Sequence, residues 1–190
     1  MKRNWINTQD VIAIAVTAIL SFFIESTLGL FLIPIIPIPL VGGLLSALFD
    51  AMIIFLANYL VPRKGGALLF ATILLSLSTI TPSFGPPGFY KVFIGIALGG
   101  TLEIVLLATG RSYKAYIFAT AIAFGLSIPM TYLAWKYFGI PTEKLQPYLW
   151  KFTGIYAFMG FVGSFIAYRY IYLNRLSKFE IIRKTRGETE

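Results

Sequence analysis

Residues 89–109 read FYKVFIGIALGGTLEIVLLAT, an apolar run with the length of a membrane helix. A helix that crosses the hydrocarbon core of a bilayer takes about 20 residues. Within this run only Lys91 and Glu103 carry a charge. The run stops at Gly110 and Arg111. The stretch therefore predicts a transmembrane helix.

The composition of the whole chain agrees with a membrane protein. Of its 190 residues, 57% are hydrophobic and 13% are charged, and the mean hydropathy is +0.79. A soluble domain is closer to half apolar and a quarter charged, and one of this length could not bury so much apolar surface in a single core. Composition excludes a cytosolic enzyme and a disordered chain. At most about eight spans fit, with no room for a separate catalytic domain.

Further apolar runs alternate with breaks rich in proline, glycine or charge. We expect helices at about 11–33, 40–60, 67–80, 89–109, 113–137 and 148–172, the third one short. Proline cannot continue a helix interior, so irregular loops are expected at 34–43, 81–88 and 138–147. The predicted fold class is an all-α integral membrane protein with six transmembrane helices. Residues 1–172 form its single domain, and residues 173–190 form a basic amphipathic cytoplasmic tail.

Basic residues set the predicted orientation in the membrane. With six spans both termini share one side, which receives twelve of the sixteen lysines and arginines: Lys2, Arg3, Arg63, Lys64, Arg111, Lys114, Arg169, Arg175, Lys178, Arg183, Lys184 and Arg186. The opposite side receives Lys91, Lys136, Lys144 and Lys151. Cytoplasmic loops carry the excess of Lys and Arg, so both termini are predicted to be cytoplasmic in a multi-pass protein of the cell membrane. The net charge of +8 then faces anionic lipid rather than nucleic acid.

Several kinds of chemistry lack the residues that they need. The chain has no cysteine and no histidine, so disulfides are excluded and zinc, haem and most redox metals lose their usual ligands. It has no GxxxxGK[ST] loop for ATP, and no nucleophile elbow or HExxH motif. We therefore expect no enzyme activity, no metal site and no cofactor.

Three acidic residues fall inside the predicted helices. At about 1.5 Å per residue, Glu25 lies in the outer third of the membrane, Asp50 near the midplane and Glu103 in the inner third. An acid at the centre of a lone helix costs about 2.5–3.5 kcal/mol, so such residues usually face a bundle interior or a wet cavity. We expect Glu25 to contact a ligand. Asp50 and Glu103 have two open alternatives, a structural hydrogen bond or coupling to ions.

Aromatic residues and lysines gather at the expected outer ends of the later helices. Together with Glu25 they form a candidate binding site for a flat polar ring, namely Tyr90, Lys91, Tyr132, Trp135, Trp150 and Tyr156. The alternative is the interfacial belt of Trp and Tyr found in membrane proteins. The loops rich in proline and glycine fall on the same side. Irregular backbone near membrane depth needs cover from protein or a cavity, which favours the binding site.

Small residues form stripes on two of the predicted helices. Ala13, Thr17 and Ser21 recur every four residues on the first, and Gly95 and Gly99 form a GxxxG pair on the fourth. Small side chains allow helix backbones to approach closely. Packing within one bundle explains most such stripes, but the stripe on the first helix could instead dock a partner subunit.

Taken together, these features resemble the substrate-binding S components of energy-coupling factor (ECF) vitamin transporters. The local likeness lies in VPRKGGALLFATI (61–73) and FGPPGFYKVFIGIALGGTLEIVLLATGR (84–111), which look like the hydroxymethylpyrimidine/thiamine-related group. The positions that carry this likeness are Arg63, Gly65, Gly66, Ala67, Gly95, Gly99, Gly100, Glu103 and Arg111. Lys91 departs from it, because a lysine at the mouth of the site suits a neutral pyrimidine or an anionic vitamin better than cationic thiamine.

The resemblance implies a subunit that captures a vitamin or vitamin precursor, with a thiamine-related pyrimidine as the best guess. It also implies docking, through the first helices, onto a transmembrane T component that carries two ABC-type ATPases. The alternative is a self-sufficient oligomeric secondary transporter or channel. In that case Glu25, Asp50 and Glu103 would couple transport to protons or ions.

Overall fold

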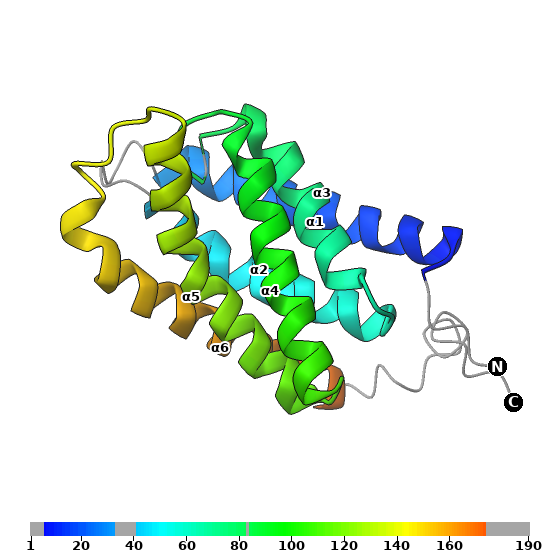
Figure 1. Cartoon of the computed structure of the whole chain (residues 1–190). Helices are drawn as coiled ribbons and strands as arrows, with labels where there is room; N and C mark the ends of the chain where they lie inside the picture. Colours follow the sequence, from blue (N-terminus) through cyan, green and yellow to red (C-terminus); the bar gives the residue numbers. More distant parts are fainter. Residues whose placement is uncertain (1–5, 33–40, 83, 174–190) are drawn as a thin grey trace, which may run out of the picture.

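A computed structural model describes residues 6–32, 41–82 and 84–173 of the chain (Figure 1). Its helices are α1 (Thr8–Leu32), α2 (Val41–Leu60), α3 (Gly66–Leu77), the 3-10 helix η1 (Ser78–Ile80), α4 (Tyr90–Thr109), α5 (Tyr113–Tyr137), the 3-10 helix η2 (Gln146–Tyr148) and α6 (Leu149–Leu173). No strand occurs among the described residues, so the predicted all-helical class is confirmed. The predicted tail, apart from Leu173, lies outside the described residues, as does the loop predicted at 34–43 except for its last three residues, which begin α2.

Five of the described helices are long and apolar enough to cross a membrane. They are Thr8–Phe31, Gly43–Leu60, Tyr90–Thr109, Tyr113–Tyr137 and Gln146–Tyr170. The third helix is shorter, because the apolar helical stretch Gly66–Ile80 stops at the turns that precede α4. Its α-helical part has 12 residues, or about 18 Å of rise, against a hydrocarbon core of about 30 Å. The finding is therefore five membrane-length helices and one short one.

The helices run back and forth between two ends of one bundle (Figure 1). At one end, called here the terminal end, Arg63 beyond α2 lies 3.1 Å from Asp10 of α1. Tyr113 at the start of α5 stacks there on Tyr168 of α6, with ring centroids 4.4 Å apart. The opposite end, called the loop end, holds the connection from η1 to α4 and the yellow loop between α5 and α6. This alternation agrees with the predicted helix order.

The first turn of α1 is fixed by polar side chains at the terminal end. The backbone N–H of Asn7 donates to Oδ2 of Asp10 at 2.8 Å, and the N–H of Asp10 donates to Oδ1 of Asn7 at 2.9 Å. This reciprocal pattern is a capping box, which satisfies backbone donors that a helix start leaves open. The ion pair with Arg63 then ties the same turn to the segment after α2.

Glycines of α4 allow close contact with α3. A Cβ built on Gly99 would lie 2.6 Å from Cα of Leu68, and one on Gly95 would lie 2.7 Å from the carbonyl oxygen of Ala71. Real side chains cannot approach so closely. The GxxxG pair therefore packs two helices of the same bundle, as the simpler interpretation of the sequence predicted.

Candidate functional site

The buried face of α1 carries the polar residues that matter most. Asp10, Ile14, Ala18, Ser21 and Glu25 are all buried, and their spacing of three or four residues places them on one side of the helix. The stripe predicted to dock a partner is therefore divided between two environments. Its third member, Ser21, faces the inside of the bundle and cannot serve a surface.

Ala13 and Thr17, the other two members of that stripe, are partly buried. The Thr17 hydroxyl donates within its own helix, to the carbonyl oxygens of Ala13 at 3.0 Å and Ile14 at 2.9 Å. A docking role for these two residues stays a prediction.

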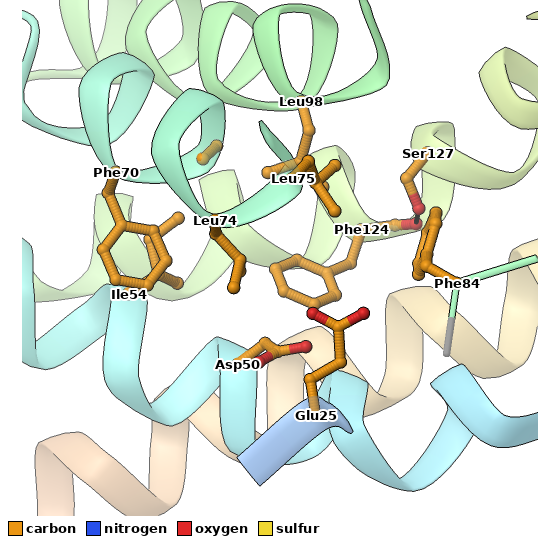
Figure 2. A pocket seen from close by; sticks show the side chains of 11 residues that line it. Glu25, Asp50, Ile54, Phe70, Leu74, Leu75, Phe84, Leu98, Phe124 and Ser127 are labelled. Atoms are coloured by element: carbon orange, nitrogen blue, oxygen red, sulfur yellow. Dashed lines mark hydrogen bonds between the residues drawn. The ribbon is translucent and has the colours of Figure 1, made fainter. Parts of the chain in front are cut away.

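A small cavity of about 20 Å³ lies between α1, α2, α3, α4 and α5 (Figure 2). Its walls are Glu25, Asp50, Ile54, Phe70, Ala71, Leu74, Leu75, Phe84, Leu98, Phe124 and Ser127. Most of these side chains are apolar. A volume of this size holds about one water molecule. The cavity therefore brings two acids, predicted at different depths, to one place.

The two carboxylates point into this cavity (Figure 2). Glu25 is 1% exposed, and its Oε2 accepts a hydrogen bond of 3.0 Å from the hydroxyl of Ser78. Asp50 is 7% exposed, and its Oδ1 accepts a hydrogen bond of 2.6 Å from the hydroxyl of Ser21. Hydrogen bonds to charged groups are stronger than those between neutral groups, so each hydroxyl holds one carboxylate in position.

Lys91 is fully buried but does not line the cavity. Its Nζ donates to the carbonyl oxygens of Ser78 at 3.0 Å and Thr81 at 2.6 Å. Carbonyls at the end of a helix lack helical donors and favour a positive charge. Lys91 reaches them from the first turn of α4. Its ammonium group therefore binds the chain after α3 outside the cavity wall, and its role at the mouth of a binding site stays a prediction.

Tyr90 and Trp135 hold residues 84–86, which cover the cavity at the loop end and are called the covering segment. The Tyr90 hydroxyl donates to the carbonyl oxygens of Phe84 at 3.3 Å and Pro86 at 2.6 Å. Trp135 meets the Tyr90 ring edge-on, with centroids 6.4 Å apart. Gly85 has φ +89°, and a Cβ there would lie 2.5 Å from Cζ2 of Trp135. Only glycine suits this place, so the segment packs tightly on both aromatic rings.

Phe84 connects this covering segment with the cavity. Its ring lines the cavity (Figure 2) and meets the ring of Tyr156 at 6.1 Å between centroids. Tyr156 is fully buried. Of the predicted binding residues, Glu25 thus lines the cavity, whereas Tyr156, Tyr90 and Trp135 lie around it.

Two predicted binding residues are placed elsewhere. Trp150 is 76% exposed on α6, and Tyr132 is partly buried against the core. Neither lines the cavity. The exposed position of Trp150 agrees with the alternative prediction, in which it belongs to an interfacial aromatic belt. The reason is that residues at helix ends turn either inward or outward, and the sequence spacing alone does not decide between the two.

Glu103 lies at the terminal end, away from the other two intramembrane acids. Its Oε1 accepts a hydrogen bond of 3.0 Å from the backbone N–H of Ala67, in the first turn of α3. Its Oε2 forms an ion pair with Arg111, which also donates to the hydroxyl of Tyr116 at 3.3 Å. A carboxylate at a helix N-terminus is favourable. These contacts agree with the structural one of the two alternatives for Glu103.

Sequence reasoning did not select Ser78, Phe84, Phe124 and Ser127 for the site. Phe84 belongs to the loop 81–88, which was predicted from its prolines and glycines. The position of that loop on the same side as the candidate site could have been used to select Phe84. The other three are common residues in apolar helices, and nothing in their spacing distinguishes them. Among the described residues no group of three or more His, Cys, Asp or Glu side chains could hold a metal ion.

Comparisons with known proteins leave the family open. No known protein family matches the sequence, and neither the curated proteins nor the solved structures include a match.

Proposed function

We propose that the chain is the membrane-embedded substrate-binding subunit of an ATP-driven importer of the ECF type. It would capture a vitamin or vitamin precursor from outside. The observation that carries this proposal is the small cavity within the helical bundle, with two carboxylates on its wall and a short covering segment at the loop end. Binding sites in helical bundles have this character, mostly apolar with a few placed polar groups.

Capture of a ring-sized solute requires the covering segment to move, because the cavity holds only about one water molecule. Phe84 is the side chain that has to withdraw, and the hydroxyl of Tyr90 and the ammonium group of Lys91 hold its segment in place. A ring that replaced Phe84 would meet the edge of Tyr156. The Glu25 carboxylate would then accept hydrogen bonds from ring amino groups.

The energy for uptake would come from partner proteins, because the sequence contains no P-loop. In this proposal a transmembrane T component with two ABC-type ATPases receives the outward face of α1. That face is apolar, with Val16, Leu20 and Phe23 exposed, and it includes the partly buried Ala13 and Thr17. Small residues among larger apolar ones permit close helix contact.

Purification from native membranes tests the proposal. The chain is expected to bring a T component and two ATPases with it, and mass spectrometry should find a small molecule in the purified complex. If the chain arrives alone and drives uptake in proteoliposomes without ATP, the proposal is refuted.

Substitutions test the site itself by equilibrium binding of the solute so identified. Glu25→Gln and Trp135→Ala are expected to weaken binding about tenfold or more, because each removes a group at or around the cavity. Glu143→Gln and Trp150→Ala make the same chemical changes at exposed positions and serve as matched controls. Equal affinity in all four variants would remove the cavity from the binding site.

Docking requires a separate experiment. Thr17→Leu enlarges the outward part of α1, so it is expected to leave solute binding intact and to block ATP-driven uptake. Loss of solute binding would instead mean that Thr17 packs within the bundle.

A second candidate function is an oligomeric secondary transporter or channel that is coupled to protons or ions. The observation in its favour is that the cavity is the size of one water molecule or ion and has two carboxylates on its wall. In this candidate Glu25, Asp50 and Glu103 couple transport to the gradient, with Glu103 acting from the terminal end, where its carboxylate binds Arg111 and the start of α3. Uptake by the purified chain alone, driven by an ion gradient, would favour this candidate.

A further inference from the structure

The buried charges of the described residues do not balance around the cavity. Four acidic side chains are buried, namely Asp10, Glu25, Asp50 and Glu103. Asp10 has Arg63 as its partner and Glu103 has Arg111. Both of these ion pairs lie at the terminal end, so their cations do not compensate the charges of the acids at the cavity.

Two acids line the cavity, and one buried base lies outside its wall. Lys91 is the one lysine or arginine that is buried in the described part of the chain. It interacts electrostatically with Glu25, and Ser78 links the two by bonding the ammonium group through its carbonyl and the carboxylate through its hydroxyl. Ser78 thus connects the Lys91 ammonium group with the Glu25 carboxylate.

Asp50 is the acid without a cation. It is more than nine-tenths buried, and its Oδ1 accepts the Ser21 hydroxyl. Across the described ranges no salt bridge joins it to a lysine or arginine. Its side chain points into the cavity (Figure 2). A buried carboxylate without a cationic partner is costly, so a positive charge placed in this cavity would be stabilised.

We propose that the cavity binds a group with a single positive charge, with Asp50 as its counter-charge and Glu25 as the second carboxylate. The group is either a small inorganic cation or the ammonium end of an organic solute. If the group is the ammonium end of an organic solute, the inference rests on the proposed substrate-binding function and adds the charge of the group that the site binds. It reverses the expectation drawn from Lys91, because that ammonium group binds backbone carbonyls outside the cavity wall.

The size of the cavity limits which cations fit. A space of about 20 Å³ takes an ion or group close to a water molecule in size. Sodium and the ammonium head of methylammonium are near this size, whereas the trimethylammonium head of choline is much larger. Choline chloride therefore supplies equal ionic strength without a fitting cation.

The test is equilibrium binding of radiolabelled sodium and radiolabelled methylammonium to the full chain in lipid nanodiscs, against choline chloride. We expect saturable binding of one of them, at about one per chain. Asp50→Asn is expected to lower the affinity about tenfold or more, because it removes the unpaired charge. Glu143→Gln, an exposed acid on the loop after α5, should leave the affinity unchanged.

A second measurement guards against a variant that fails to fold. In choline chloride alone, Asp50→Asn should melt at least as high as the unsubstituted chain, since it relieves a buried charge. Adding the bound cation should raise the melting temperature of the unsubstituted chain and not that of the variant. No saturable binding of either cation, with equal melting responses in both proteins, would overturn the inference.

The two sources of the charge give different results. Binding of sodium identifies an inorganic cation site, and binding of methylammonium without sodium identifies the ammonium group of a solute. The inference and the proposed function also fail separately. A chain that purifies with its ATPases but binds neither cation refutes only the inference, whereas one that binds a cation and transports without ATP refutes only the proposed function.

Discussion

Two neighbouring glycines of α4 are predicted to respond in opposite directions to the same substitution. Gly99 faces α3, where an added Cβ would lie 2.6 Å from Cα of Leu68 and 3.0 Å from the carbonyl oxygen of Ala67. Around Gly100, an added Cβ would find nothing within 4 Å. We therefore expect Gly99→Ala to destabilise the bundle and Gly100→Ala to stabilise it.

The magnitude follows from two terms. Replacing glycine by alanine inside a helix gains up to about 1 kcal/mol at either position. Overpacking at a close helix contact costs about 1–3 kcal/mol, and only Gly99→Ala incurs it, because its Cβ meets backbone atoms that cannot turn away. The helix term cancels between the two variants, so their free energies of unfolding should differ by about 1–3 kcal/mol. For a chain of this length the difference corresponds to about 2–12 °C in melting temperature.

Heat unfolding in detergent micelles, followed by tryptophan fluorescence, measures this difference. With Trp5 and Trp150 replaced by phenylalanine, the reporter is Trp135, which is 4% exposed and packs on Tyr90. A second pair on α6 repeats the test, because a Cβ on Gly163 would lie 2.3 Å from the carbonyl oxygen of Leu48, whereas one on Gly154 has nothing within 4 Å. Equal melting temperatures within both pairs would refute the close packing on which the reasoning depends.

Two further predictions concern the ends of the bundle. Glu103→Ala should destabilise the protein by about 1–3 kcal/mol in thermal unfolding, because the N–H of Ala67 loses a charged acceptor, whereas Glu103→Gln keeps an acceptor oxygen and should cost less. A loss of uptake in Glu103→Gln at an unchanged melting temperature would instead indicate coupling to ions. Tyr90→Phe removes the hydroxyl that binds the covering segment. With Trp135 as the only tryptophan, acrylamide should quench its fluorescence faster in this variant, while Tyr137→Phe, at a side chain 87% exposed, should change nothing. Identical quenching in both variants would mean that the hydroxyl does not hold the segment.

The helices could be predicted closely from the sequence. The prediction of 113–137 coincides with α5, and the prediction of 89–109 differs from α4 by one residue. An apolar run of about 20 residues between breaks satisfies its own backbone hydrogen bonds only as a helix when it lies in a bilayer. The apolar run at 67–80 is shorter than the others, and α3 is short because the run that forms it is short.

The candidate site could be predicted only in part. Glu25 was expected to contact a ligand because an acid within an apolar helix seldom faces lipid, and it does line the cavity. Lys91 was expected to line the site as well, but its flexible side chain reaches carbonyl oxygens ten and thirteen residues earlier in the chain. The destination of such a side chain depends on where the preceding turn folds, and this information is absent from residue spacing.

The sequence by itself determined that the chain is helical and apolar enough for a membrane, since hydropathy and helix breaks act locally along the chain. It also indicated that Glu25, Asp50 and Glu103 are buried, because burial follows from their place within apolar helices. Only the tertiary structure decided that Asp50 joins Glu25 at one cavity while Glu103 binds Arg111 at the other end. The physical reason is that charge balance depends on distances between helices, and these are fixed by contacts such as that of Gly99 with Leu68.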